Sequence, residues 1–339
     1  MQTLHAGLLS LLLLSPALFP AAVQAERRDS YTVKNAFKPV IRQAAQSVVR
    51  VFLKGRPTAL GAIVDPQGYL LTKASEVLDR NGAPRGPLQC QAYSGQRYDA
   101  EVAGFDDSLD LALLKIKDFE EKAPAITWSI STPAAGGWVA TPGIVSLPEA
   151  IGVISAPARA VKRRLAVLGV YLVESPDGAE VHRIWPSSGA AKAGLKEGDV
   201  VIALDGKEMR GRDQITRAIQ ERLPGDLVKL SILRGENKLM VEAELMDKSR
   251  LPQGSSVDDD SEEKLSGRLS RRRDGFPSVL QHDSILRPEL CGGPLVNLKG
   301  EVIGLNIARA SRVSSYAVPA ALARQAAQKM ISQAIVHRE

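Results

Sequence analysis

Short apolar segments separated by turn residues fill residues 48–156 and return near the C-terminus. They recur at intervals of about 8–12 residues, which is typical of the strands of an all-β barrel or sandwich. The turn at Asp65–Gly68 has a physical reason, because Pro66 presets φ and Gly68 tolerates a positive φ. We therefore predict strands within 48–116, 138–156 and 278–318, and a closing helix over 319–335.

Residues 165–247 carry a different pattern, in which apolar strands alternate with short helices. Val200–Leu204 is a strand closed by an Asp-Gly turn. The segment Arg212–Arg222 places Ile215 and Ile219 on one helical face and ends before a Pro-Gly pair. The pattern predicts a small α+β unit between two β-rich parts of the chain.

Residues 248–275 contain few apolar side chains. An acidic block at 258–263 precedes the basic residues Arg268 and Arg271–Arg273. Segments with this composition usually stay solvated. We predict a charged flexible linker over 248–275, and an electrostatic docking arm is the alternative.

The N-terminus has the features of a secretory signal. Leu8–Phe19 is apolar but too short to span a bilayer comfortably, and Val23–Ala25 offers small residues for a signal peptidase. The segment before it lacks Lys and Arg, so an uncleaved anchor is the alternative. We predict a signal peptide over 1–25 and a mature chain that is secreted or periplasmic, without a stable membrane span after cleavage.

Composition narrows the class of protein further. With 339 residues, 44% hydrophobic and 24% charged, the chain is expected to be globular and to hold about two domains. Aromatic residues at 4% argue against stacking on single-stranded nucleic acid, so no nucleic-acid partner is expected. Four histidines and two cysteines hardly suffice for a zinc site, so no metal or other cofactor is expected. Whether Cys90 and Cys291 pair stays open.

The stretch from Pro186 to Gly206 is similar to the signature of the PDZ domains of the HtrA (Do-like) family. A small sheet with an open edge can bind a peptide as an added strand. The resemblance implies that residues 165–247 bind peptides or protein C-termini, with Val170–Val173 and the helix at Ile215 and Ile219 as walls. It assigns carboxylate binding to the loop formed by Val167, Leu168, Gly169 and Val170. A PDZ fold used only for internal packing is the alternative.

Four further segments resemble the trypsin-like protease domain of the same family: residues 58–72, 107–116, 281–297 and 315–319. The resemblance implies an all-β-dominated fold, a chymotrypsin/trypsin-like double β-barrel with an inserted α+β PDZ domain. Its two parts would be residues 38–160 and 276–335, because the PDZ-like stretch interrupts the second barrel. Neighbouring termini allow a PDZ domain to be hosted by a surface loop.

The chemistry departs from the family at three positions. A triad needs a nucleophile, a general base and N–H donors for the oxyanion. By resemblance the base position holds Ser75, the aspartate is Asp110 and the nucleophile position holds Cys291. The oxyanion loop, which includes Cys291, begins with Glu289 where the family has Gly. We expect the carboxylate of Glu289 to oppose formation of a thiolate at Cys291. Glu76, which follows Ser75 in the sequence, is expected to point away from the site.

Three functions follow from these residues. The favoured hypothesis is a proteolytically inactive HtrA-like protein that binds peptides in envelope quality control or as a scaffold. The alternative is an active endopeptidase with Cys291 as nucleophile and an unforeseen base, for which His282 is the first candidate. The third is binding of acidic polymers through Lys162–Arg164 and Arg271–Arg273. Partner identity, oligomeric state and an active paralogue that works beside this chain stay open.

Overall fold

The computed structural model describes residues 30–79, 81–120, 123–248, 251 and 268–336. The expected signal peptide over 1–25 lies outside these residues. Within the described residues, no helix is both long and apolar enough to cross a membrane.

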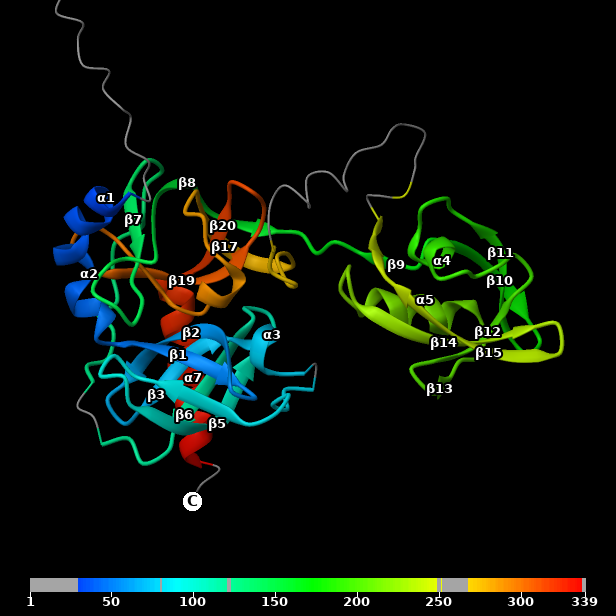
Figure 1. The fold of residues 1–339 in the computed structure, drawn as a ribbon, viewed down its shortest axis with the longest axis horizontal. Helices are drawn as coiled ribbons and strands as arrows, with labels where there is room; N and C mark the ends of the chain where they lie inside the picture. The colour runs from blue at the N-terminus through cyan, green and yellow to red at the C-terminus, as the bar shows by residue number, and fades with distance from the viewer. Residues whose placement is uncertain (1–29, 80, 121–122, 249–250, 252–267, 337–339) are drawn as a thin grey trace, which may run out of the picture.

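The first barrel closes from six strands in the order β1-β2-β3-β6-β5-β4 (Figure 1). Its strands are β1 (Val48–Leu53), β2 (Arg56–Asp65), β3 (Tyr69–Lys73), β4 (Leu88–Gln91), β5 (Arg97–Asp106) and β6 (Leu111–Ile116). Gly68, in the turn between β2 and β3, has φ +89°, as the Asp65–Gly68 pattern predicts. β3 is buried along its whole length and pairs with β2 and β6.

The second barrel takes its strands from two distant parts of the chain. It closes in the order β17-β20-β19-β18-β7-β8. The strands are β7 (Trp138–Thr141), β8 (Ala150–Val161), β17 (Phe276–His282), β18 (Pro294–Val296), β19 (Val302–Arg309) and β20 (Ser315–Pro319). β8 pairs with β17 in a register that sets Val161 opposite Phe276. The double β-barrel expected from the sequence is therefore present, and residues 162–275 leave and re-enter the second barrel at adjacent strands.

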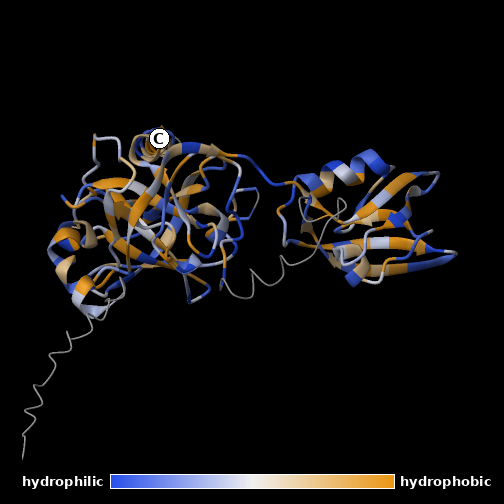
Figure 2. Ribbon diagram, turned by 90° about the horizontal axis from the view of Figure 1, so that it is seen from above, coloured by the Kyte–Doolittle hydropathy of each residue, from blue (hydrophilic) through white to orange (hydrophobic). Residues whose placement is uncertain are grey.

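A separate unit forms between those two strands, with its own hydrophobic core. Its main sheet has the order β10-β11-β12-β14-β15, with β13 beside β12, and β9 pairs with β16. The strands are β9 (Ala166–Val167), β10 (Val170–Ser175), β11 (Gly178–Ile184), β12 (Val200–Leu204), β13 (Lys207–Glu208), β14 (Leu227–Arg234), β15 (Asn237–Glu244) and β16 (Met246–Asp247). The helices are α4 (Gly189–Lys192) and α5 (Arg212–Gln220). Figure 2 shows both hydrophobic and polar stretches in this unit; β12 is hydrophobic throughout, whereas β14 contains both kinds of residue.

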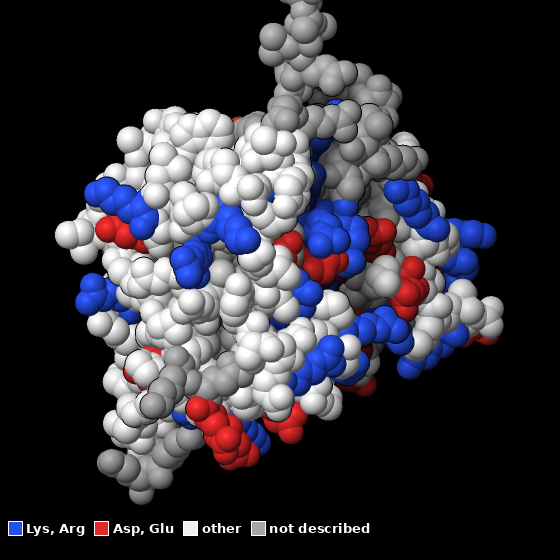
Figure 3. All heavy atoms as spheres, turned by 60° about the vertical axis from the view of Figure 1, so that its left-hand side comes forward, with Lys and Arg blue, Asp and Glu red and all other residues white. Residues whose placement is uncertain are grey.

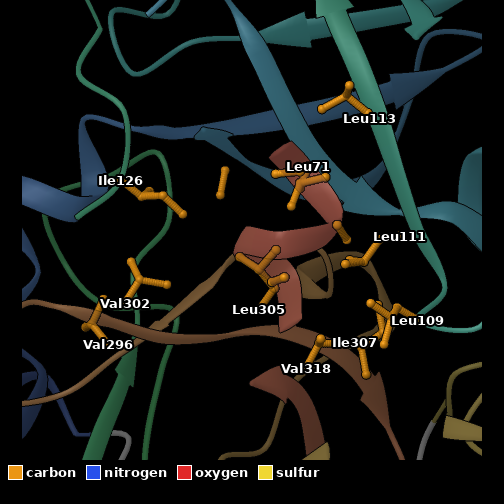
Figure 4. Packing of buried hydrophobic residues seen from close by; sticks show 14 of the residues in the cluster. Leu71, Leu109, Leu111, Leu113, Ile126, Val296, Val302, Leu305, Ile307 and Val318 are labelled. Atoms are coloured by element: carbon orange, nitrogen blue, oxygen red, sulfur yellow. The ribbon is translucent and has the colours of Figure 1, made fainter. Parts of the chain in front are cut away.

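The helices at the start and at the end of the described chain pack against the double barrel. α1 (Tyr31–Ala36) begins at Ser30, whose hydroxyl accepts from the Val33 N–H, and α2 (Lys38–Ala45) follows. The closing helix α7 (Ala320–Val336) packs against β5 and β19, one strand from each barrel. Figure 4 shows side chains of both barrels gathered around it in the largest core cluster.

The prediction of a flexible linker over 248–275 is wrong for its C-terminal residues. Residues 252–267 lie outside the described residues, but Arg268–Gly275, here called the strap, packs against the double barrel. Ser270 is 0% exposed and Asp274 4% exposed. Asp274 accepts a hydrogen bond from Arg164 at 2.5 Å. Within the strap, Arg268, Arg271 and Arg272 pair with carboxylates from other parts of the chain, which composition alone does not reveal.

We expect the double barrel to fold without the PDZ-like unit, provided that the strap is retained. Replacing residues 165–266 by a Gly/Ser linker keeps β8, the strap and β17, so the second barrel can still close. The protein should unfold in one cooperative transition, measured by circular dichroism and urea titration. A chain ending at Val161 lacks four strands of that barrel and should be insoluble; a soluble, cooperatively folded product would contradict the inserted-domain interpretation.

Candidate functional site

Ser75 and Asp110 meet at the adjacent ends of two paired strands. β3 runs directly into the short helix α3 (Ala74–Val77), and Asp110 immediately precedes β6. The Ser75 N–H donates to Asp110 Oδ1 at 2.7 Å, and its hydroxyl donates to Asp110 Oδ2 at 2.9 Å. Asp110 is 1% exposed and has φ +57°, a conformation that Asp tolerates better than most residues. Two of the predicted triad positions are thus in direct contact.

A buried lysine completes this arrangement. Lys73 is 0% exposed, and its ammonium lies 3.0 Å from Asp110 Oδ2. The same nitrogen donates to the carbonyls of Ile307 at 2.8 Å and Arg272 at 2.9 Å. An ammonium has three protons to donate, so these three acceptors satisfy it. The sequence analysis missed Lys73, although a lone charge in an otherwise apolar strand was a signal.

Asp110 consequently has a different role from a triad aspartate. In a triad the aspartate accepts the Nδ1–H of the base histidine and orients the imidazole. Here Oδ2 accepts from both Lys73 and Ser75, and Oδ1 accepts from the Ser75 backbone. A serine hydroxyl that donates to a carboxylate cannot take a proton from a nucleophile near neutral pH. The carboxylate stabilises a lysine rather than a base.

The thiol of Cys291 is enclosed. Cys291 is 0% exposed, and its Sγ lies 3.8 Å from the hydroxyl of Ser270 in the strap. Burial raises the pKa of this thiol to about 11, although the charge of Lys73 and the contact with Ser270 act in the opposite direction. At neutral pH the group is therefore the protonated thiol, which is a poor nucleophile.

The backbone beside Cys291 is also engaged. The 3-10 turn η2 (Pro288–Leu290) leads into Cys291, whose N–H donates to the Pro288 carbonyl at 3.0 Å. In trypsin-like enzymes the N–H of the nucleophile is one of the oxyanion donors. The next N–H, of Gly292, donates to the Asn306 carbonyl at 2.6 Å. In this conformation the N–H of Cys291 does not serve an oxyanion.

The acidic residues near the thiol differ from the expectation. Glu289 pairs with Arg268 at 2.9 Å. Burial is the main cause that raises the pKa of Cys291, and the charge of Glu76 adds a smaller contribution in the same direction. Burial, first of all, raises the pKa of Glu76 itself, and the charge of Lys73 opposes this. Glu76 lies in α3 and is partly buried, within reach of the charges of Lys73 and Asp110.

The described histidines are poorly placed to act as a base. His282 lies on β17 inside the second barrel, where burial lowers its pKa to about 4 despite the opposite effect of Asp283. His182 is on β11 of the PDZ-like unit, against Tyr171. The Cys291 sulfur contacts the Ser270 hydroxyl and the Arg309 backbone, and neither group is a base. Both cysteines are free and buried, so Cys90 and Cys291 do not form a disulfide.

The peptide site expected in the PDZ-like unit has a suitable backbone. β10 is an edge strand of its sheet, so one side of it has no neighbouring strand among the described residues. Gly169 has φ +79°, and a Cβ there would lie 2.3 Å from Ser188 Cβ, so the loop Val167–Val170 requires glycine at this point. Ile215 and Ile219 are 0% and 5% exposed. They belong to the core in this structure, and their part in a groove wall stays a prediction.

A cavity of about 790 Å³ separates α5 and its neighbours from the double barrel. Ser75 and Asp110 line it from the barrel, and Asp226 lines it from the PDZ-like unit. Within the described residues, no cluster of three His, Cys, Asp or Glu side chains could hold a metal ion. Figure 3 shows basic and acidic side chains intermixed on the face in view rather than one basic patch.

Comparison with known proteins gives two family matches. Residues 59–201 match the trypsin-like peptidase domain, and residues 166–245 match the PDZ domain. The matches overlap over 166–201, where the structure has the strands and helix of the second unit. The periplasmic serine endoprotease DegP of Salmonella typhimurium is 24% identical over 282 residues, 58% of each chain. The chain belongs to the HtrA-type family.

Two further proteins are similar to parts of this HtrA-type protein. The periplasmic pH-dependent serine endoprotease DegQ of Escherichia coli is 41% identical over 68 residues, 20% of this chain and 15% of DegQ. A solved serine endoprotease from Yersinia pestis has a TM-score of 0.30 and 19% identity, covering 62% of this chain and 97% of that one. The chain thus covers little more than half the length of DegP and less of DegQ.

The Lys73–Asp110 pair should be essential for stability. Replacing Lys73 by Met leaves a buried, uncompensated carboxylate, and we expect a loss of about 3–5 kcal/mol in the free energy of unfolding. The double variant Lys73→Met/Asp110→Asn removes both charges and should recover part of this loss. Urea denaturation followed by circular dichroism measures both. Equal stability of wild type and Lys73→Met would contradict the structural role given to Asp110.

Proposed function

We propose that this HtrA-type protein is a pseudoprotease that binds peptides or protein C-termini through its PDZ domain. The observation that carries the proposal is the state of Cys291, whose thiol is fully buried and whose N–H is bound to the Pro288 carbonyl. Neither a thiolate nor a free oxyanion donor is available at the nucleophile position. The partner of the thiol is a serine hydroxyl, which is not a base.

The environment of Asp110 supports the same conclusion independently. An active triad needs its aspartate to hold a base, whereas Lys73 and Ser75 occupy both oxygens of this carboxylate. Restoring a histidine at position 75 would leave Lys73 in contact with Oδ2. The loss of the base alone typically costs several powers of ten in rate. The environment of Asp110 therefore supports a protein that keeps the protease fold but does not cleave peptides.

Peptide binding is supported by the open edge of β10 and by the glycine-dependent loop before it. An added strand can pair with β10, and successive N–H groups of a loop can hold a terminal carboxylate. The periplasmic relatives and the apolar N-terminus favour a secreted or periplasmic location. There the protein would act in envelope quality control or as a scaffold.

The absence of proteolysis can be tested with an unfolded substrate. Wild type should cleave reduced, denatured casein no faster than a buffer control, because no base activates Cys291. Cys291→Ala should give the same trace in a gel or fluorescence assay. Cleavage by wild type that Cys291→Ala stops would identify an active peptidase instead and would overturn the pseudoprotease interpretation.

Peptide capture can be tested with matched termini. Peptides that end in an apolar residue with a free carboxylate should bind with roughly micromolar Kd, as in other grooves that bind an added strand. The same peptides with an amidated terminus should bind at least about tenfold more weakly, because charge-assisted hydrogen bonds to the carboxylate are lost. Isothermal titration calorimetry gives both constants. Equal binding of the two forms would remove the loop Val167–Val170 as the site.

A further inference from the structure

The strap lies over Cys291 and Lys73 in the manner of a bound peptide. The surface of the double barrel that it covers is called the cleft below. Burial alternates along it, because Ser270 is buried and Arg272 is 13% exposed at its side chain, whereas Arg271 between them is 55% exposed. Alternation of this kind is typical of an extended segment with one face on a surface. The face with Ser270 and Arg272 is turned toward the double barrel.

Ser270 is held by the backbone at the end of β19. Its N–H donates to the Arg309 carbonyl at 3.1 Å, and the Arg309 N–H donates to the Ser270 hydroxyl at 2.9 Å. The guanidinium of Arg309 donates to the Leu286 carbonyl at 2.9 Å, which fixes the loop beside the cleft. One of these bonds joins the two backbones and the other uses the Ser270 side chain, so the strap is anchored to the barrel at this residue.

Arg272 provides the second attachment. Its carbonyl accepts from the buried Lys73 ammonium at 2.9 Å, so the strap supplies one of the three acceptors of that lysine. Its guanidinium donates to Asp107 at 3.0 Å and to the Ser108 carbonyl at 3.3 Å. The strap therefore contacts both chemically distinctive groups of the cleft, the Cys291 thiol through Ser270 and the Lys73 ammonium through Arg272.

The opposite face of the strap contacts the PDZ domain. Arg271 donates to Asp226 Oδ1 at 2.8 Å. Asp226 is 6% exposed, and its Oδ2 accepts from the Leu223 N–H just after α5. The PDZ side of this contact is thus a buried, oriented carboxylate.

We propose that the cleft above Cys291 is a second peptide-binding site, whose resident ligand is the strap, and that Asp226 of the PDZ domain holds the strap in place through Arg271. The ligand it recognises is an extended peptide with a small hydroxyl side chain over the thiol and an arginine two residues later. Cys291 is reactive toward reagents in solution only while the strap is away. The proposal does not depend on peptide binding by the PDZ groove.

The rate of alkylation of Cys291 by iodoacetamide in the folded chain tests the proposal. Mass spectrometry of tryptic peptides separates Cys291 from Cys90. Arg271→Gln should raise the rate about two- to fivefold, the effect expected for one partly exposed ion pair. The larger, charged side chain in Ser270→Glu does not fit the buried position, so the strap should leave its site more often. The alkylation rate should then rise about tenfold or more, because protection of the thiol depends on the fraction of molecules with the strap in place. The matched control is Arg222→Gln, which breaks the Arg222–Asp205 pair on the same cavity without touching the strap.

A free peptide then tests whether the cleft is a binding site. The acetylated and amidated peptide with the sequence of residues 268–276 should slow alkylation of both variants toward the wild-type rate, whereas a scrambled peptide should not. Thermal melting shows whether each variant is folded. If one of the two strap variants does not fold, the other variant alone tests the proposal.

Each result has a definite meaning. Unchanged rates in both strap variants would overturn the proposal, because the strap would then not be what shields the thiol. Faster alkylation without protection by the peptide would overturn the binding site. An effect of Arg222→Gln equal to that of Arg271→Gln would overturn the role of the Arg271–Asp226 contact.

Discussion

A buried positive charge at the end of β3 constrains everything around the cleft. Taking an ammonium out of water costs several kcal/mol unless it is fully compensated. Lys73 obtains that compensation from Asp110 and from two carbonyls, of Ile307 in the second barrel and Arg272 in the strap. Three parts of the chain that are distant in sequence must therefore converge on one nitrogen. The position of the strap follows from this requirement as much as from its own residues.

The same constraint gives Asp110 a structural role that does not depend on catalysis. In an active enzyme the aspartate is kept by its role in orienting the base. Here Asp110 is required because Lys73 is buried, and Ser75 adds two hydrogen bonds to the same carboxylate. Cys291 has likewise become part of the packing, since its N–H closes the η2 turn and its thiol lies under Ser270. Each of the three positions that align with the triad carries a structural interaction in this chain.

The sequence predicted the architecture because local pattern and motif agreed. Alternating apolar segments with turns such as Asp65–Gly68 indicated the barrel strands, and the helical face of Ile215 and Ile219 indicated α5. The charged strap could not be predicted in the same way. Arg268 and Arg271–Arg273 look solvated when counted, and only the fold brings Asp107, Asp226 and Glu289 to them. Charge pairing between distant segments leaves no periodic signal in the chain.

The site shows the same limit at the level of single residues. Resemblance placed Ser75, Asp110 and Cys291, and the structure brings Ser75 and Asp110 into contact. The resemblance gave no information on what surrounds these residues, because it assigns no role to the positions of Lys73 and Ser270. The sequence did not show that a short helix, α3, follows Lys73 and contains both Ser75 and Glu76. The surroundings of Ser75, Asp110 and Cys291 are therefore set by packing between segments that are distant in sequence, and a motif alone does not predict them.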